Sequence, residues 1–155
     1  MNIHSQYTQS GISTKEGPVI ETLRIDPKAV LPKRAHSSDG GADIYSNVTV
    51  TIAPGESMLV PTGIAIKIPY GYAGFLMNRS SQRVNKITSL GEGLIDADYR
   101  GELKVFIDNQ SKVPYSITAY ETRIAQLVIV PVVLATFVDT WNDTSRGNGG
   151  FGSTK

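Results

Sequence analysis

Short apolar and polar segments alternate along the chain and are separated by proline and glycine. The alternation is clean over residues 48–52 and 64–68, which indicates strands with one buried face. The same pattern predicts strands over residues 19–25, 47–52, 57–60, 63–68, 74–77, 102–108 and 122–133, with turns at 53–56, 60–63 and 69–72. Strands this frequent, without a long amphipathic helix, predict an all-β sandwich or barrel.

Two segments depart from this alternation. Residues 80–86 suit one short helix, with Ser80 or Ser81 as its N-cap. Residues 124–133 are almost entirely apolar, so we expect a strand that is buried on both faces or lies in a subunit interface. Gln126 interrupts this apolar run. Because an unpaired amide is costly to bury, we expect Gln126 to bond to the protein or to a ligand.

Composition narrows the class of protein. With 155 residues and 40% hydrophobic content, the chain is long enough to bury about two-thirds of its unfolded surface in one domain. The absence of cysteine excludes thiol catalysis, disulfides and cysteine-ligated zinc, and it fits a reducing cytoplasm. A net charge of +1 without a basic cluster argues against general nucleic-acid binding. No segment resembles a signal peptide or a membrane span, so we expect a soluble intracellular protein.

The sequence divides into a polar leader (residues 1–17), a β domain (18–140) and a glycine-rich C-terminal arm (141–155). We expect the leader to be flexible and the arm to be mobile until a ligand orders it. The arm carries Arg146 and Phe151, which could neutralise a phosphate and stack on a base. The alternative is a disordered tail without a role.

The acids of the chain are most concentrated at residues 91–102. Gly91 and Gly93 flank Glu92 in a predicted tight turn, whose backbone is open to a flat polar partner. Asp96 follows an apolar pair, at the end of a predicted strand, where a carboxylate could activate water. In a strand Asp96 and Asp98 would share a face, whereas in a turn they would not. The alternative is a hairpin with solvated acids and a half-buried Tyr99.

Two further polar groups interrupt the strands. Asp43 follows two glycines just inside a strand, where we expect a structural carboxylate that binds backbone amides rather than a catalytic group. Arg79, Ser80 and Ser81 lie where the predicted helix begins. An arginine fork and a helix N-terminus both favour phosphate, and the alternative is a capped helix with a surface arginine.

These stretches together resemble the trimeric dUTPase family (deoxyuridine triphosphate nucleotidohydrolases) from about residue 19 onward. The segments that carry the resemblance, in the order of the family's five motifs, are residues 41–46, 79–81, 93–102, 123–127 and 146–154. The resemblance implies a jelly-roll-like β subunit, a homotrimer with three sites at the subunit interfaces, and an arm that closes over a neighbouring site. It also implies hydrolysis of dUTP to dUMP and pyrophosphate, which limits uracil in DNA and supplies dUMP.

The resemblance also implies roles for individual residues. Asp96 would deprotonate the attacking water and bond the sugar 3′-hydroxyl, while Tyr99 would exclude a ribose 2′-hydroxyl. The other implied substrate contacts are Arg79, Ser80, Ser81 and Gln126 for the α- and β-phosphates, Arg146, Ser153 and Thr154 for the γ-phosphate, Gly91, Gly93 and Ile95 around uracil, and Phe151 and Gly152 of the arm over it. Asp43 and Asp98 would support the site. Mg²⁺ would be held by substrate phosphates and waters, without a direct protein ligand.

Several positions depart from the family pattern. Asn78 replaces a glycine or proline, and residues 82–84 replace an apolar, alanine-rich turn. Residues 121–122 and Glu92 also differ from the common pattern. Alternatives on the same fold are a dCTP deaminase, for which Glu92 is the available acid, and a dUTPase with an added regulatory protein partner. We expect a cytoplasmic location, or the host cytoplasm if the chain is encoded by a phage or virus.

Overall fold

The computed structural model describes residues 17–91 and 93–141 of the chain. The expected leader up to residue 16 and the expected arm from residue 142 onward lie outside these ranges. The described elements are β1 (Glu21–Arg24), β2 (Gly41–Tyr45), β3 (Val50–Ile52), β4 (Ser57–Lys67), β5 (Tyr72–Met77), α1 (Ser80–Val84), β6 (Ile87–Gly91), β7 (Leu94–Ile95), β8 (Glu102–Asn109), β9 (Tyr115–Ile117) and β10 (Arg123–Pro131).

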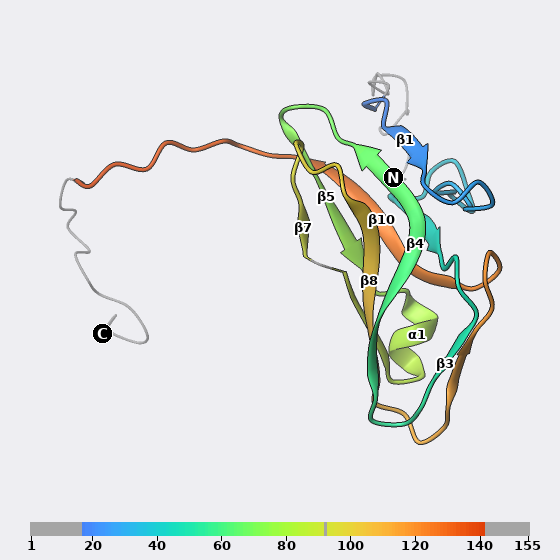
Figure 1. Ribbon diagram of the computed structural model, residues 1–155. Coiled ribbons are helices and arrows are strands. Elements are labelled where there is room, and N and C mark those ends of the chain that lie inside the picture. Colours follow the sequence, from blue (N-terminus) through green and yellow to red (C-terminus); the bar gives the residue numbers. More distant parts are fainter. Residues whose placement is uncertain (1–16, 92, 142–155) are drawn as a thin grey trace, which may run out of the picture.

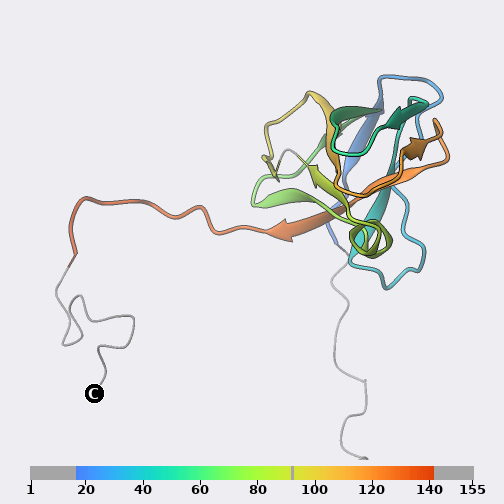
Figure 2. The same ribbon diagram turned by 90° about the horizontal axis from the view of Figure 1, so that it is seen from below.

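The strands form two four-stranded antiparallel sheets and one small pair (Figure 1). The first sheet has the order β1-β4-β8-β6, the second has the order β2-β10-β5-β7, and β3 pairs with β9. The view from below shows the strands packed around one interior, with α1 at its side (Figure 2). The prediction of an all-β, jelly-roll-like subunit with one short helix is confirmed.

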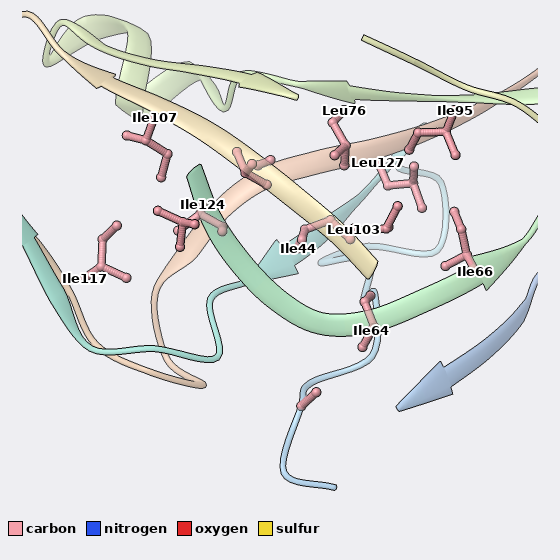
Figure 3. Packing of buried hydrophobic residues seen from close by; sticks show 14 of the residues in the cluster. Ile44, Ile64, Ile66, Leu76, Ile95, Leu103, Ile107, Ile117, Ile124 and Leu127 are labelled. Carbon is pink, nitrogen blue, oxygen red and sulfur yellow. The ribbon is translucent and has the colours of Figure 1, made fainter. Parts of the chain in front are cut away.

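A continuous apolar core fills the space between the two large sheets (Figure 3). On β8 the alternation decides the arrangement, since Leu103, Val105 and Ile107 are buried while the residues between them are more exposed. Ile124 and Leu127 of β10 close the same core from the opposite sheet. The two sheets thereby become a rigid support for the polar residues at their ends.

The turn predicted at residues 60–63 is wrong, because β4 continues through it. Its register with β8 shifts between Pro61 and Ala65, so the extra residues form a bulge instead of reversing the chain. Gly63 has a φ of +71° there, and its amide donates to Glu102 Oε1 over 2.9 Å. Thr62 Oγ1 donates to the Leu103 carbonyl over 2.6 Å, which anchors the bulge to β8.

Helix α1 is shorter than predicted and is capped differently. It ends at Val84, and its N-cap is Arg79 rather than Ser80 or Ser81. The reason is a side-chain bond, since Gln82 Oε1 accepts the Arg79 amide over 3.2 Å. Within the described ranges no helix has the length and apolarity to span a bilayer. The predicted turns at 53–56 and 69–72 are confirmed by backbone bonds across them.

The apolar run at residues 124–133 divides into two parts. Ile124, Ala125 and Leu127 are buried in the core, and the residues from 128 to 130 are half-buried. Beyond β10 the chain leaves the domain as the extended segment, residues 132–141 (Figure 1). Val133 is 93% exposed and Phe137 is 94% exposed. Burial on both faces therefore holds only for the start of this run, and the interface alternative stays a prediction.

A carboxylate anchors the loop that follows β1. Asp26 Oδ1 accepts the Lys28 amide over 2.9 Å, and Asp26 Oδ2 accepts the Tyr120 hydroxyl over 2.8 Å. These bonds favour the charged form, and with the bond from Lys28 as the largest cause they lower the pKa of Asp26 below its ordinary 3.8. The carboxylate in turn raises the pKa of Tyr120. Asp26 therefore joins residues that lie far apart in sequence.

Replacing Asp26 with asparagine should lower the melting temperature at neutral pH and flatten its decline in acid. As the pH falls, the unfolded chain takes up a proton on Asp26 before the folded chain does, so this stabilisation is lost below the ordinary value of 3.8. Thermal melts of both proteins across the acid range will measure the effect. Tyr120→Phe is the matched control, because it removes one bond but keeps the carboxylate. Parallel acid limbs for wild type and Asp26→Asn would contradict this assignment.

Candidate active site

Several of the predicted site residues line one pocket at the ends of β2, β5 and β10. This arginine pocket has a volume of about 360 Å³. Its lining residues are Ala35, Asp39, Gly40, Gly41, Asp43, Arg79, Ser80, Arg123 and Gln126. Sheet pairing explains why they meet, since Gln126 of β10 lies opposite Asp43 of β2 and Met77 of β5. Asp43, Arg79, Ser80 and Gln126 thereby line one pocket, and their roles toward a substrate stay a prediction.

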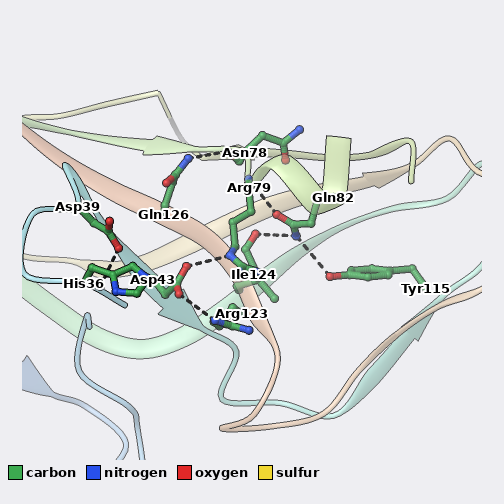
Figure 4. A network of polar contacts seen from close by, with 10 residues as sticks. All are labelled: His36, Asp39, Asp43, Asn78, Arg79, Gln82, Tyr115, Arg123, Ile124 and Gln126. Carbon is green, nitrogen blue, oxygen red and sulfur yellow. Dashed lines mark hydrogen bonds and ion pairs between the residues drawn. The ribbon is translucent and has the colours of Figure 1, made fainter. Parts of the chain in front are cut away.

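Asp43 binds two guanidinium groups rather than the backbone amides that we expected. Its Oδ1 accepts a hydrogen bond from Arg79 Nε over 2.8 Å and its Oδ2 accepts one from Arg123 Nη1 over 3.3 Å (Figure 4). The carboxylate has a side-chain exposure of only 15%. Asp39 also lines the pocket, so the formal charges of its two arginines and two aspartates balance. The guanidinium N–H groups that Asp43 does not use are the groups that can bind an anionic ligand. Sequence reasoning gave Arg123 no role, although its position three residues before Gln126 placed it at the start of the same strand.

Gln126 has the partner that its position required. Its Nε2 donates to the Asn78 carbonyl over 2.9 Å, at the residue before Arg79. A Cβ at Gly41 would lie 2.8 Å from Gln126 Oε1, so the glycine makes room for this amide. An amide nitrogen carries two hydrogens, and the bond to Asn78 uses one of them.

Ser80 and Ser81 face different pockets. Ser80 lines the arginine pocket, whereas Ser81 lines a neighbouring pocket of about 460 Å³ together with Gln82, Asn85 and Tyr115. The Ser81 carbonyl accepts the Asn85 side-chain amide over 2.9 Å. Arg79 also lines this neighbouring pocket, so Ser81 stays beside Arg79 although it does not line the pocket of Ser80 and Gln126. Its role toward a substrate stays a prediction.

The acid at residue 96 lies in a second, smaller pocket. This acid pocket has a volume of about 110 Å³ and is lined by Leu94, Ile95, Asp96 and Tyr99. Strand β7 pairs with β5, and Ile95 is buried while Leu94 is 51% exposed. Asp96 itself is exposed within the subunit.

A turn, not a strand, holds the two acids. The Tyr99 amide donates to the Asp96 carbonyl over 3.2 Å, and Arg100 Nη1 donates to the Ala97 and Tyr99 carbonyls over 2.7 and 2.8 Å. Asp96 and Asp98 therefore do not share a strand face, and Asp98 is an exposed member of the turn. The backbone here therefore follows the alternative given for residues 91–102, a hairpin with solvated acids.

Tyr99 is positioned by a glycine and a carbonyl. Its hydroxyl donates to the Glu102 carbonyl over 3.1 Å, and a Cβ at Gly101 would overlap its ring. Gly93 has the positive φ expected of the turn, at +82°, with open space around it. Gly91 lies in β6 opposite Val105, while Glu92 is outside the described residues.

The two pockets are separate within one subunit. Ile95 lies opposite Gly74, and Gly74 lies opposite Ile129 of β10. Asp96 is thus displaced from Gln126 by about 13 Å along the strands and about 10 Å across them, at ordinary strand spacings. A single chain does not place Asp96 and Arg79 in the same pocket.

The remaining predicted contacts lie outside the described residues. They are Arg146, Phe151, Gly152, Ser153 and Thr154. Among the residues that the structure describes, no group of three histidine, aspartate or glutamate side chains is arranged to hold a metal ion. The predicted site residues that the structure does describe lie in or beside the arginine pocket, the neighbouring pocket of Ser81 and the acid pocket.

Comparisons with known proteins show the family to which the chain belongs. The dUTPase family model matches residues 27–155. The deoxyuridine 5'-triphosphate nucleotidohydrolase of Corynebacterium efficiens is 44% identical over 140 residues, covering 87% of this chain and 77% of its own length. That of Corynebacterium diphtheriae is 46% identical over 141 residues, covering 88% and 92%.

Solved structures show the same fold. The dUTPase of Staphylococcus bacteriophage 80alpha, a G164S mutant with dUpNHpp, has a TM-score of 0.73 at 29% identity and covers 88% of this chain and 98% of its own. A mutant dUTPase from phage phi11 of S. aureus, for which coordination of a structural Mg(II) ion is described, has a TM-score of 0.73 at 27% identity and covers 81% and 100%. With a family model matching most of its residues, the chain belongs to the dUTPase family.

Proposed function

We propose that this protein hydrolyses dUTP to dUMP and pyrophosphate. The observation that carries the proposal is the division of the site into the arginine pocket around Arg79 and the acid pocket around Asp96. The first suits the phosphates and the second suits the nucleoside end of the substrate. The bacterial relatives are named deoxyuridine 5'-triphosphate nucleotidohydrolases, and this name supports the same reaction. In the cytoplasm, or in a host's cytoplasm, this reaction limits uracil in DNA.

Asp96 is the proposed general base. Its carboxylate is exposed and can accept a proton from a water molecule. The water oxygen then attacks the α-phosphorus in line, the bond to the bridging oxygen breaks, and pyrophosphate leaves. The turn bonds made by Arg100 to the Ala97 and Tyr99 carbonyls hold Asp96 in place.

The arginine pocket is the proposed phosphate site. Arg79 donates its Nε hydrogen to Asp43, and the planar guanidinium keeps further N–H groups that can donate to phosphate oxygens. Ser80 and Gln126 line the same pocket and can donate to the α- and β-phosphates. The γ-phosphate roles of Arg146, Ser153 and Thr154, and the contacts of Phe151 and Gly152 with uracil, rest on the sequence motif.

Magnesium fits this site as a partner of the substrate. Asp43 already binds two arginines, and the described residues form no carboxylate cage. The ion would therefore be held by the triphosphate and waters, where its charge neutralises the phosphate oxygens. The family relative with a structural Mg(II) ion supports magnesium use.

A homotrimer is the proposed assembly. Because one subunit keeps its two pockets apart, a second copy must bring an acid pocket to each arginine pocket. Exposed apolar surface is available for that contact, with Phe75, Met77 and Leu94 on the second sheet and Phe137 and Trp141 on the extended segment. Light scattering should give the mass of three chains.

The function is tested by pyrophosphate release from dUTP, UTP and the four ordinary deoxynucleoside triphosphates. We expect release from dUTP with little from the others. An enzyme that leaves dUTP intact would overturn the proposal. Ammonia released from dCTP would instead identify the deaminase alternative.

Replacing Tyr99 with alanine should raise the ratio of UTP to dUTP hydrolysis by about tenfold or more, because the ring is proposed to occupy the space of a ribose 2′-hydroxyl. The ratio of kcat/KM values for the two nucleotides measures this effect. Tyr99→Phe is the control, since it keeps the ring and loses only the bond to the Glu102 carbonyl. An unchanged ratio in the alanine variant would remove this role from Tyr99.

A further inference from the structure

We propose that Gln82 is a positioning residue that holds Arg79 and Ser80 in the geometry needed to bind the substrate phosphates. The inference rests on the proposed function, because it concerns the arrangement of the arginine pocket. Gln82 does not line that pocket. It acts through the main chain at the start of α1.

The side-chain amide of Gln82 joins three segments of the fold. Its Oε1 accepts the Arg79 amide over 3.2 Å, and its Nε2 donates to the Ile124 carbonyl over 3.0 Å and to the Tyr115 hydroxyl over 3.3 Å (Figure 4). Gln82 is only 4% exposed. Both Nε2 hydrogens are therefore engaged inside the protein, and the amide is fixed in one orientation.

Arg79 is consequently held at two points. Its side chain binds Asp43, which also binds Arg123, while its main-chain amide binds Gln82, which also binds the Ile124 carbonyl. Both connections end on neighbouring residues at the start of β10. An arginine held at its side chain and its main chain keeps one direction toward the pocket, and the adjacent Ser80 is fixed with it.

The short helix needs such a connection. With five residues, α1 has few main-chain bonds of its own, so its position depends on side chains that tie it to the sheets. Residues 82–84 also depart from the apolar turn that is common in the family. An apolar side chain at this position can fill the core, but it cannot bond both the Arg79 amide and β10. Gln82 therefore fills the core as an apolar residue would, and it also orients Arg79 relative to β10.

The test compares Gln82→Met with wild type in the full chain. Methionine has a similar length and fills the space without the amide. We expect kcat/KM for dUTP to fall by roughly tenfold to a hundredfold, mainly through kcat, because small displacements of phosphate-binding groups have effects of this size. Binding of the imido analogue dUpNHpp should weaken. Binding of deoxyuridine, which has no phosphate, should stay within about twofold by NMR titration.

Tyr115→Phe is the matched control. It removes one bond of Gln82 but leaves the bonds to Arg79 and Ile124, so the melting temperature should fall while kcat/KM stays within about twofold. If Gln82→Met does not fold, Gln82→Asn replaces it. The shorter amide cannot reach Arg79 and Ile124 together and should give the same loss.

A folded Gln82 variant with a lower melting temperature and wild-type kinetics would overturn the inference, because Gln82 would then serve only the core. An equal loss for deoxyuridine and dUpNHpp would also overturn it. A wild-type protein that does not hydrolyse dUTP would refute the proposed function instead. In that case the two binding measurements still decide whether Gln82 orients the arginine pocket.

Discussion

Asp96→Asn should reduce turnover of dUTP by roughly 10²- to 10⁴-fold while dUTP binding stays within about tenfold. An asparagine side chain can still bond the sugar hydroxyl, but it cannot take a proton from water. The carboxylate is exposed at the edge of the acid pocket, so the substitution leaves the core residue Ile95 untouched. Pyrophosphate release and calorimetric binding of dUpNHpp measure the two quantities separately.

Asp108→Asn is the control for this experiment. Asp108 is a carboxylate on β8 that accepts the Ser57 hydroxyl over 2.9 Å, and asparagine can still accept that bond. It does not line the acid pocket, so turnover should match wild type. Turnover near wild type in purified Asp96→Asn would show that another group deprotonates the water.

Gly63→Ala should lower the free energy of unfolding by about 3 kcal/mol, which is in the range of strongly destabilising substitutions. The φ of +71° alone is unfavourable for alanine by about 1–2 kcal/mol. The new Cβ would also lie 2.8 Å from Asp26 Cβ and 2.9 Å from Asn47 Nδ2. Because the Gly63 amide binds Glu102, and the Glu102 carbonyl accepts the Tyr99 hydroxyl, the strain should also reduce activity.

Gly55→Ala separates the two causes. Gly55 has a φ of +80° but nothing within 4 Å of an added Cβ, so only the backbone term applies. Its destabilisation in urea should be about 1–2 kcal/mol. An equal loss of unfolding free energy in the two variants would show that the bulge of β4 shifts to make room for the added methyl group.

The strands were predictable where side chains alternate, and unpredictable where the chain bends without reversing. The alternation at residues 102–108 identifies β8, one face of which is buried. The alternation at residues 64–68 identifies β4 as a strand, but the single buried face that we expected is not found, since Ile64, Ala65 and Ile66 are all buried. Proline and glycine at residues 60–63 are equally compatible with a chain reversal and with a bulge. The hydrogen bonds from Thr62 to the Leu103 carbonyl and from Gly63 to the Glu102 side chain decide for the bulge. Strand β9, with three residues, is too short for a periodic pattern.

The candidate site was predictable in its residue types but not in its pairing. Asp43, Arg79 and Gln126 were each identified as polar interruptions, and antiparallel pairing of β2 with β10 and of β10 with β5 brings them together. The partners of Asp43 depend on that register, which no local pattern encodes. The separation of Ser80 from Ser81 depends on the direction of α1, which the amide of Gln82 sets.

The position of β10 also determines when the chain can fold during its synthesis. The last strand of the domain lies in the middle of the second sheet, between β2 and β5. Until the ribosome has made residues 123–131 and released them from its exit tunnel, β2 and β5 each have an unpaired edge where β10 will lie. Nascent chains that stop before this strand expose both edges together with the apolar face of β5, and they are substrates for chaperones and proteases rather than partly working enzymes.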